Sequence, residues 1–285
     1  MKVVRTPGEV REQVSAARSR GTAIGLVPTM GYFHEGHLSL MRLARQESGF
    51  CVVSLFVNPT QFGPGEDLAS YPRDFDRDLE LAGREGVDLL FAPEAAAMYQ
   101  PGASTYVEET SVSRGLCGKS RPGHFRGVAT VVTKLFNIVA PDLAIFGRKD
   151  LQQLMLIRRM VRDLDLPVRI IAAPIVREPD GLALSSRNVY LSPAEREKAP
   201  RFHLSLLEGA RDMTGAKGEV AQILKDTARR IEERTGGTID FVSAVDEDMQ
   251  EVSRPEDCRY LAGALFLGRA RLIDNVRIGA AGELD

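Results

Sequence analysis

Short apolar runs alternate with amphipathic stretches along the first 175 residues, and this alternation constrains the fold more than any other feature of the sequence. Apolar, β-branched runs predict buried strands at 23–27, 51–57, 87–92, 143–146 and 168–172. Apolar residues at helical spacing predict helices over 9–18, 38–46, 74–85, 128–139 and 151–164. Strict strand and helix alternation is typical of a doubly wound parallel sheet, so we expect a Rossmann-like α/β fold.

The pattern changes after Pro174. A polar, glycine-containing loop over 177–188 is followed by predicted helices over 193–213 and 219–233 and by strands over 239–245, 263–267 and 271–276. We therefore place a domain boundary near Ile175, with one domain over residues 1–175 and a smaller α+β domain over residues 176–285. An irregular connection over 95–123 includes a predicted short strand at 105–108.

Charge and cysteine usage exclude several functional classes. The net charge of -2 and the pI near 6.2 give no general attraction to nucleic acid or to anionic lipid, so anion binding must be local. Cys51, Cys117 and Cys258 form neither a CxxC pair nor a disulfide framework, which predicts reduced thiols. No apolar run approaches the roughly 20 residues of a membrane span, so we expect a cytoplasmic enzyme of small molecules.

The stretch PTMGYFHEGH, residues 28–37, joins the first of these strands to the following helix. We expect a glycine-containing turn and then a first helical turn that carries His34 and His37. Such a helix start offers free backbone N–H groups and a partial positive charge, which together bind anions. Two histidines three residues apart share one helix face, so both imidazoles can point at the same anion, with phosphate as the natural candidate.

Two more polar stretches follow predicted strands, NPTQFG at 58–63 and GRKD at 147–150. Open α/β sheets bind ligands at the carboxyl ends of their strands. We therefore expect one sheet edge to collect His34, His37, Gln61, Lys149 and Asp150, with the triplet Ser185, Ser186 and Arg187 closing over it from the domain junction. Imidazoles, a lysine and a guanidinium suit nucleotidyl transfer, because they neutralise the charge that builds as pyrophosphate leaves.

Each of these features has another interpretation when it stands alone. The two histidines are compatible with a structural cap or with half of a zinc site, although the second histidine comes one residue too early for the HExxH pattern. Lys149 and Asp150 alone would be a solvated ion pair, and Gln61 and Gln153 alone would be surface amides. The combination of all of them favours a phosphate site.

Taken together, the motifs resemble a known family. The stretches PTMGYFHEGH, FVNPTQFG, SRPGHFRGV, GRKDLQQLMLIRRMVRDL and REPDGLALSSRNVYLS, in this order and spacing, resemble the pantothenate synthetase family, the ATP-dependent pantoate:β-alanine ligases. They extend from about residue 24 to residue 192 of this chain. The resemblance implies that ATP and pantoate give pantoyl adenylate and pyrophosphate, and that β-alanine then displaces AMP to form pantothenate.

The resemblance also implies roles for individual residues. His37 is expected to donate a proton, His34 to assist it on the phosphates, and Lys149 to act with them. Gln61 matches a contact to pantoate and β-alanine, and Gln153 matches a second pantoate contact. The expected ATP-binding residues are Met30, Gly31, Tyr32, Phe33, His34, Glu35, Gly36, His37, Gly147, Arg148, Lys149, Asp150, Val176, Leu184, Ser185, Ser186 and Arg187. Residues 1–175 would then bind ATP and pantoate, with residues 176–285 as a lid domain.

The family implies magnesium with ATP and a homodimer built through the N-terminal domain. This chain departs from the family pattern at Arg148, which is usually acidic or an amide, and at Leu184, which is usually Met. Replacing Met by Leu preserves volume and apolarity. Two rival functions are an adenylyl or cytidylyl transferase that stops at the nucleotide adduct, and a nucleotide-binding regulatory protein with a decayed site.

Overall fold

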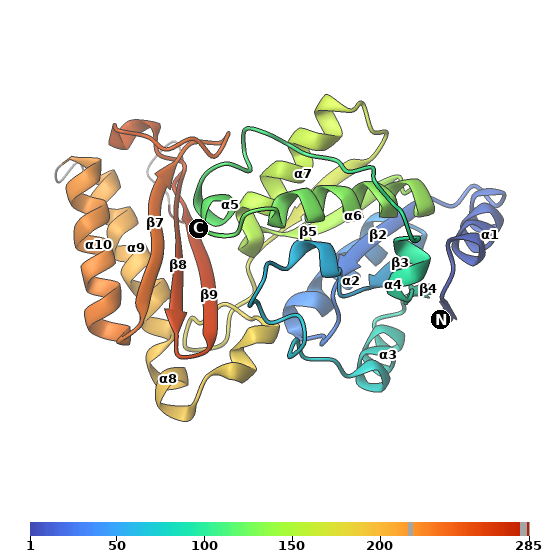
Figure 1. Ribbon diagram of the computed structural model, residues 1–285, viewed down its shortest axis with the longest axis horizontal. Coiled ribbons are helices and arrows are strands. Elements are labelled where there is room, and N and C mark those ends of the chain that lie inside the picture. The colour runs from blue at the N-terminus through green and yellow to red at the C-terminus, as the bar shows by residue number, and fades with distance from the viewer. Residues whose placement is uncertain (216–218, 280–283, 285) are drawn as a thin grey trace. The chain divides into compact units, whose positions relative to one another are not determined.

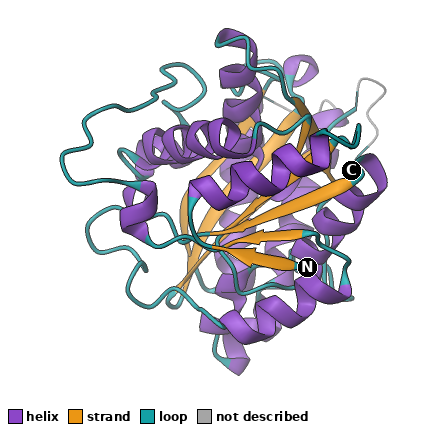
Figure 2. Cartoon of the chain, turned by 90° about the vertical axis from the view of Figure 1, so that its right-hand side faces the viewer, coloured by secondary structure: helices purple, strands orange, loops and turns teal. Residues whose placement is uncertain are grey.

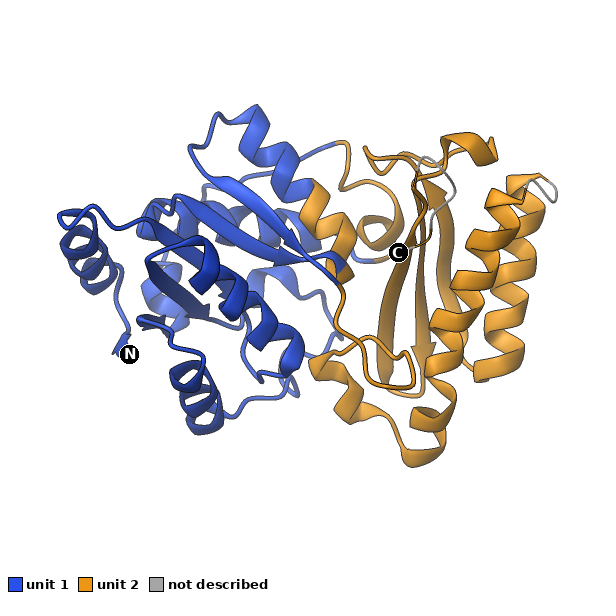
Figure 3. Ribbon diagram, turned by 180° about the vertical axis from the view of Figure 1, so that it is seen from behind, with its two compact units in different colours: residues 1–110, 121–148, 156–174 blue, residues 111–120, 149–155, 175–285 orange. Residues whose placement is uncertain are grey.

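The computed structural model describes residues 1–215, 219–279 and 284, and the chain divides into two compact units (Figure 3). Unit 1 comprises residues 1–110, 121–148 and 156–174, and unit 2 comprises residues 111–120, 149–155 and 175–285. Residues 216–218, 280–283 and 285 belong to the predicted range 176–285 and lie outside the described part.

A six-stranded parallel sheet forms the centre of unit 1 (Figure 2). From one edge to the other its strands are β1 (Lys2–Val4), β4 (Leu89–Phe91), β3 (Phe50–Leu55), β2 (Ile24–Thr29), β5 (Leu143–Gly147) and β6 (Arg169–Ala173). Along the chain the order runs from β2 outward to β4 and then restarts at β5 on the other side of β2. This arrangement confirms the predicted doubly wound sheet.

Helices cover both faces of this sheet. Helix α2 (Glu35–Glu47) contacts β2, β3, β5 and helix α3 (Phe75–Arg84), whereas α1 (Pro7–Arg18) and α6 (His124–Val139) contact each other and β2 (Figure 1). Unit 1 also contains the short helix α4 (Ala95–Met98) and the 3-10 helix η1 (Pro59–Gln61). Helix α6 is buried on most of its surface, as its apolar sequence predicts.

The core between α2, α3 and the sheet explains why these segments fold together. Val27, Cys51 and Val53 of the central strands are fully buried and pack with Met41 of α2 and Ala82 of α3. Full burial of a large apolar side chain contributes about 1.5–3 kcal/mol through removal of apolar surface from water. The polar segments that follow the strands are therefore carried on a rigid base.

Unit 2 is built on a three-stranded antiparallel sheet, with α9 (Pro200–Thr214) and α10 (Val220–Thr235) packed side by side on it (Figure 1). Its strands are β7 (Thr238–Val245), β8 (Tyr260–Leu267) and β9 (Ala270–Arg277). Phe202 and Leu206 of α9 are buried against Leu261 and Leu265 of β8. The remaining elements are α5 (Leu116–Ser120), α8 (Pro193–Lys198), η3 (Ser186–Tyr190) and η4 (Pro255–Asp257), while η2 (Arg148–Asp150) and α7 (Leu151–Asp163) contain residues of both units.

The structure corrects three local predictions. Residues 105–108 form no strand, and the N–H of Val107 instead donates to Oγ1 of Thr130 at 3.0 Å. The helix expected over 193–213 is two helices, because Pro200 has no N–H with which to continue α8 and instead opens α9. Strand β1 was not predicted. In the described part of the chain, no helix combines the length and the apolar character needed to cross a membrane.

Candidate active site

The strands that precede the predicted site residues end level with one another. In the parallel pairings, Thr29 at the end of β2 lies beside Leu55 at the end of β3, and Gly147 at the end of β5 lies beside Ala173 of β6. Strands β2 and β5 are neighbours, and the strand order reverses between them. This switch point is where doubly wound sheets bind their ligands, and the stretch PTMGYFHEGH begins there.

The turn after β2 is held by a buried carboxylate. Asp78 of α3, which is 1% exposed, accepts the backbone N–H groups of Tyr32 and Phe33 at 2.6 Å each. Gly31 and Tyr32 both have positive φ angles, and a Cβ on Gly31 would lie 2.9 Å from Oδ2 of Asp78. Burial raises the pKa of Asp78, and the two N–H donors oppose only part of that rise. Asp78 thus sets the path of the chain into α2.

The two histidines lie at the start of α2, as expected. His34 is the N-cap residue and His37 occupies the third helical position, with their ring centroids 4.1 Å apart. The backbone N–H of His34 donates to Nδ1 of His37 at 3.4 Å. An N–H donates only to an unprotonated nitrogen, so Nε2 carries the proton of the neutral ring. The His37 ring therefore presents a donor on its other side.

Glu35, the other polar residue in the first turn of α2, pairs with an arginine farther along the helix. Both carboxylate oxygens of Glu35 accept from Arg42 on the next turns of α2, at 2.7 and 2.9 Å, and both side chains are largely exposed. Only the backbone of Glu35 is therefore left to contact an anion at the helix start. This pairing removes a negative charge from the region that we expect to receive phosphates.

Gln61 ends helix η1 and is 8% exposed. Its Oε1 accepts from Nδ2 of Asn58 at 3.2 Å, and its Nε2 lies 3.1 Å from Sδ of Met30. Asn58 is 1% exposed, and its Oδ1 accepts from the hydroxyl of Tyr99 at 2.9 Å and from the N–H of Thr60. Asn58 thus determines which end of the Gln61 amide is the donor.

The stretch SRPGHFRGV contacts the backbone of Gln61. Nδ1 of His124 lies 2.8 Å from the carbonyl oxygen of Gln61, and Arg121 lies 3.1 Å from the other ring nitrogen while it pairs with Glu66 at 2.6 Å. Burial works against the Glu66 charge, but Arg121 holds the pKa of that carboxyl below its usual range. At Gly127, a Cβ would lie 2.4 Å from the carbonyl oxygen of Thr60, so α6 and η1 are in backbone contact.

Gly147 and Arg148 belong to unit 1, and unit 2 contains the predicted groups from Lys149 onward. Nζ of Lys149 lies 3.8 Å from Oδ2 of Asp150, whose side chain is half exposed, and the carbonyl oxygen of Lys149 accepts from Nδ2 of Asn275 at 3.2 Å. Ser185 caps η3 by accepting the N–H of Arg187 at 3.2 Å, and Ser186 is buried. The carbonyl oxygen of Val176 accepts from the N–H of Leu184 at 3.0 Å.

Two adjacent glutamines have different surroundings. Gln152 is 6% exposed, accepts the N–H of Cys117 and donates to the carbonyl oxygens of Val112 and Gly115, so its amide is fully used in tying two segments of unit 2 together. Gln153 is only half-buried. The structure therefore gives Gln152 a structural role and leaves Gln153 as the candidate for substrate contact.

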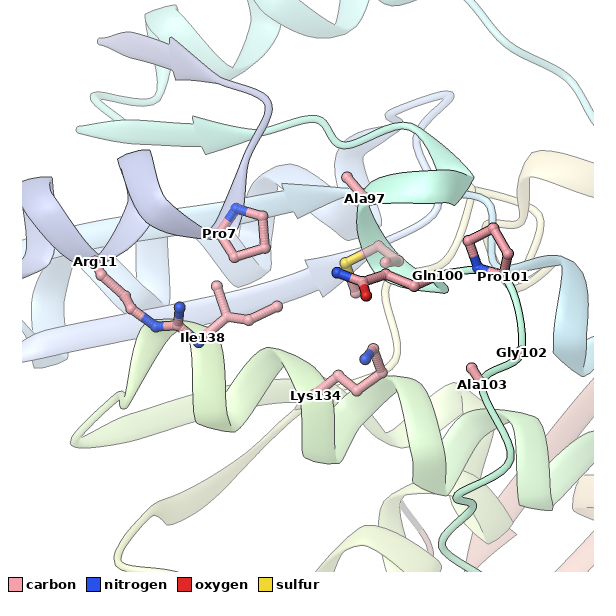
Figure 4. Close-up of a pocket in the computed structure, with 10 residues that line it drawn as sticks. Pro7, Arg11, Ala97, Gln100, Pro101, Gly102, Ala103, Lys134 and Ile138 are labelled. Carbon is pink, nitrogen blue, oxygen red and sulfur yellow. The ribbon is translucent and has the colours of Figure 1, made fainter.

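Each unit contains a cavity, and only the cavity in unit 2 is lined by predicted site residues. In unit 1 a cavity of about 550 Å³ lies between α1, α4 and α6, where Figure 4 shows Arg11, Lys134 and Gln100 around it. None of the predicted site residues lines that cavity. In unit 2 a cavity of about 10 Å³ is lined by Lys149, Ser185, His203 and Asp274 among others. Its volume is about the minimum needed to hold one water molecule.

The comparison with protein families decides the assignment. The family model described as pantoate-beta-alanine ligase matches residues 2–277. This chain belongs to that family. It is an enzyme, an ATP-dependent ligase of pantoate and β-alanine. The prediction from the sequence motifs is thereby confirmed for the family and for the reaction.

Relatives and solved structures of the pantoate-beta-alanine ligase family cover nearly all of this chain. A pantothenate synthetase of Thermotoga petrophila is 51% identical over 98% of this chain and 100% of its own length, and one of Moorella thermoacetica is 52% identical over 97% and 98%. The crystal structure of pantothenate synthetase from Thermus thermophilus is 46% identical, with a TM-score of 0.89 over 97% of this chain and 99% of that chain. The ligase of Francisella tularensis, complexed with β-γ ATP and β-alanine, is 33% identical with a TM-score of 0.81, over 97% of both chains.

Proposed function

We propose that this ligase works through a pantoyl adenylate, and that the start of helix α2 binds the phosphates of ATP. The main support is the His37 ring, whose Nδ1 accepts the N–H of His34 and whose Nε2 is therefore a donor at a helix start. The ATP-binding residues are Met30 to His37, Gly147 to Asp150, the backbone of Val176, and Leu184 to Arg187. The domain over residues 1–175 binds ATP and pantoate, and residues 176–285 act as the lid.

In the first step, a carboxylate oxygen of pantoate attacks the α-phosphorus of ATP. The bond from that phosphorus to the bridging oxygen breaks, and pyrophosphate leaves with the electron pair. His37 and His34 donate to the phosphates, and Lys149, Ser185, Ser186 and Arg187 bind the departing charge. Each charge-assisted hydrogen bond contributes about 1.5–3 kcal/mol, and a bond that strengthens only as the charge develops lowers the barrier by that amount.

In the second step, the amine nitrogen of β-alanine attacks the acyl carbon of the adenylate. The bond from that carbon to the AMP oxygen breaks, AMP leaves with the electron pair, and the nitrogen releases a proton to solvent. Gln61 holds the reacting carboxyl of pantoate and the incoming β-alanine through its Nε2 group, because Asn58 engages Oε1. Gln153 supplies a second contact to pantoate.

Magnesium arrives with the nucleotide in this proposal. Among the described residues, no group of three or more His, Cys, Asp or Glu side chains is arranged to hold a metal ion. Mg²⁺ usually keeps several waters and binds through phosphates plus one or two carboxylates, so the fit to this chain is through ATP and not through a protein cage. When bound, the ion would neutralise phosphate charge beside Lys149.

The protein acts in the cytoplasm as a homodimer formed through its N-terminal domain. Three free cysteines, Cys51, Cys117 and Cys258, support a reducing compartment, because secreted proteins usually oxidise such thiols. The dimer rests on the family resemblance alone. Sedimentation equilibrium measures it directly, and a monomer mass at assay concentrations would contradict it.

An isotope experiment tests the adenylate. Pantoate labelled with ¹⁸O in its carboxylate is incubated with ATP, Mg²⁺ and β-alanine, and the products are analysed by mass spectrometry. An adenylate transfers one labelled oxygen to AMP, because the acyl carbon–oxygen bond breaks in the second step. Label in inorganic phosphate would indicate an acyl phosphate and overturn the proposal. A transferase that stops at the adduct would release pyrophosphate without forming the β-alanine amide.

A further inference from the structure

The segment from Val176 to Arg187, here called the SSR loop, is attached to strand β9. The loop is a narrow hairpin, in which Arg177 and Ala183 form an isolated antiparallel bridge and the N–H of Leu184 donates to the carbonyl oxygen of Val176. Beyond the bridge, Glu178 and Asp180 both pair with Arg196 of α8 at 2.7 Å. The base of this hairpin immediately precedes the residues proposed to bind phosphate.

Asp274 of β9 holds the base of the SSR loop. Asp274 is 4% exposed, and its two carboxylate oxygens accept from the two terminal nitrogens of Arg177 at 2.7 and 3.0 Å. Nδ1 of His203 lies 3.1 Å from Oδ2 of the same carboxylate. A two-pronged pair of this kind fixes the direction of the guanidinium as well as its distance.

The neighbouring residue on β9 holds the other proposed phosphate group. Nδ2 of Asn275 donates to the carbonyl oxygen of Lys149 at 3.2 Å, and the N–H of Asn275 donates to Oδ1 of Asp274 at 2.8 Å. Lys149, Ser185 and Asp274 also line the same small cavity. Asp274 therefore contacts Arg177 at the base of the SSR loop, and the adjacent Asn275 contacts the backbone of Lys149.

Asp274 keeps its charge in this buried position. Burial alone would raise the pKa of Asp274, but His203 and Arg177 hold it below its usual range. A buried ion pair is often no more stabilising than apolar residues of similar volume, so stability alone does not explain the arrangement. What the pair does supply is a fixed geometry between β9 and the SSR loop.

We propose that Asp274, together with Arg177, is a positioning residue that holds Lys149 and the SSR loop in the positions needed to bind the phosphates of ATP. The proposal rests on the role given above to Lys149, Ser185, Ser186 and Arg187. Asp274 itself does not touch ATP in this proposal. Its effect is transmitted through Arg177 to the loop and through Asn275 to the backbone of Lys149.

The test compares D274N with D240N in the full-length protein. Asp240 of β7 also pairs with an arginine, Arg271 of β9 at 2.6 Å, and its side chain is 12% exposed, but its carboxylate contacts Arg271 and Ser120 and not the SSR loop. D240N is thus a matched loss of a carboxylate–guanidinium pair in the same sheet. Pantoate-dependent pyrophosphate release is measured against ATP and against β-alanine, with the unfolding temperature of each variant.

The expected result is a KM for ATP that rises about tenfold or more in D274N, with the KM for β-alanine changed by less than about twofold. D240N should lower the unfolding temperature without changing the KM for ATP. If both variants lose ATP affinity in parallel with their stability, or if folded D274N keeps the wild-type KM for ATP, the proposal is wrong.

Further variants keep the test decisive if D274N does not fold. R177K keeps the charge but not the two-pronged geometry, and R177M removes both, so we expect a partial and a full rise in the KM for ATP. K149A serves as the reference for the proposed function. If K149A is unaffected, the role of Lys149 fails irrespective of Asp274; if K149A is impaired while D274N and R177M are not, only the positioning role fails.

Discussion

Asp78 binds Phe33 through a 2.6 Å hydrogen bond from the backbone N–H of Phe33 to Oδ1 of Asp78. The two residues are 45 positions apart in the sequence, so this bond fixes the turn after β2 from a different helix. The turn also has Gly31 and Tyr32 at positive φ, a conformation that needs external support for a residue other than glycine. The position of the histidines at the start of α2 depends on this support.

We expect D78N to impair catalysis more than it impairs folding. An amide in place of the carboxylate leaves one of the two N–H groups opposite an NH₂ group, and an unsatisfied buried donor costs about 1–3 kcal/mol. The turn should shift, and pantoate-dependent pyrophosphate release should fall by about tenfold or more. D76N, at an exposed position of the same helix, is the control and should retain activity.

Replacement of His37 tests the donor at the start of α2. H37A should reduce pyrophosphate release by about 10²–10³-fold, which is the usual effect of removing one preorganised donor from a charged transition state. Far-UV circular dichroism and the unfolding temperature check that the variant is folded. Q46A changes an exposed side chain near the end of the same helix and should retain wild-type turnover. Wild-type turnover in H37A would exclude the ring from the chemistry.

Gly127 provides a steric test of the Gln61 support. In G127A the new methyl group would lie 2.4 Å from the carbonyl oxygen of Thr60, a backbone atom that cannot move without displacing η1. We expect a loss of about 1–3 kcal/mol in unfolding free energy and a higher KM for pantoate. G8A, in α1 with nothing within 4 Å of the added Cβ, should be neutral or stabilising by up to about 1 kcal/mol. Equal behaviour of the two variants would contradict the contact.

The lowered pKa of Asp274 predicts a dependence of stability on pH. An unfolded aspartate titrates near about 3.9, so the stabilisation by His203 and Arg177 is fully present above that pH. It is lost as the pH falls through the lower pKa of the folded state, because the proton then binds the unfolded chain first. Urea unfolding of wild type and D274N should differ at pH 7 and converge in acid. A constant difference down to low pH would contradict the assignment.

The arrangement of the parallel sheet was predictable because its strands are buried and apolar while the helices between them are amphipathic. Local signals alone predicted β2, β3, β4, β5 and β6. Strand β1 escaped prediction because it has only three residues and a single buried side chain, Val4. The break before Pro200 was readable from the proline itself, which has no N–H with which to continue a helix.

A local motif was enough to place the two histidines at a helix start, whereas groups that contact distant partners carried no such signal. His34 and His37 are adjacent to their own helix start, so spacing was enough. Asp78 and Asn58 contact partners 45 and 41 residues away, and no local pattern marks such partners. One signal was available for Asp78, because it lies three residues after Phe75 on the apolar face of a predicted helix. A lone carboxylate there needs a buried donor.

The burial of Cys51 in the core beneath α2 has a practical consequence for chemical labelling. Burial raises the pKa of the Cys51 thiol to about 12 and that of Cys258 to about 11, so neither forms a thiolate at neutral pH. Cys117, which is only half-buried, should therefore be the position at which a maleimide dye attaches to the native wild-type enzyme. A fluorophore introduced there would report on unit 2 without the need to engineer a cysteine-free background.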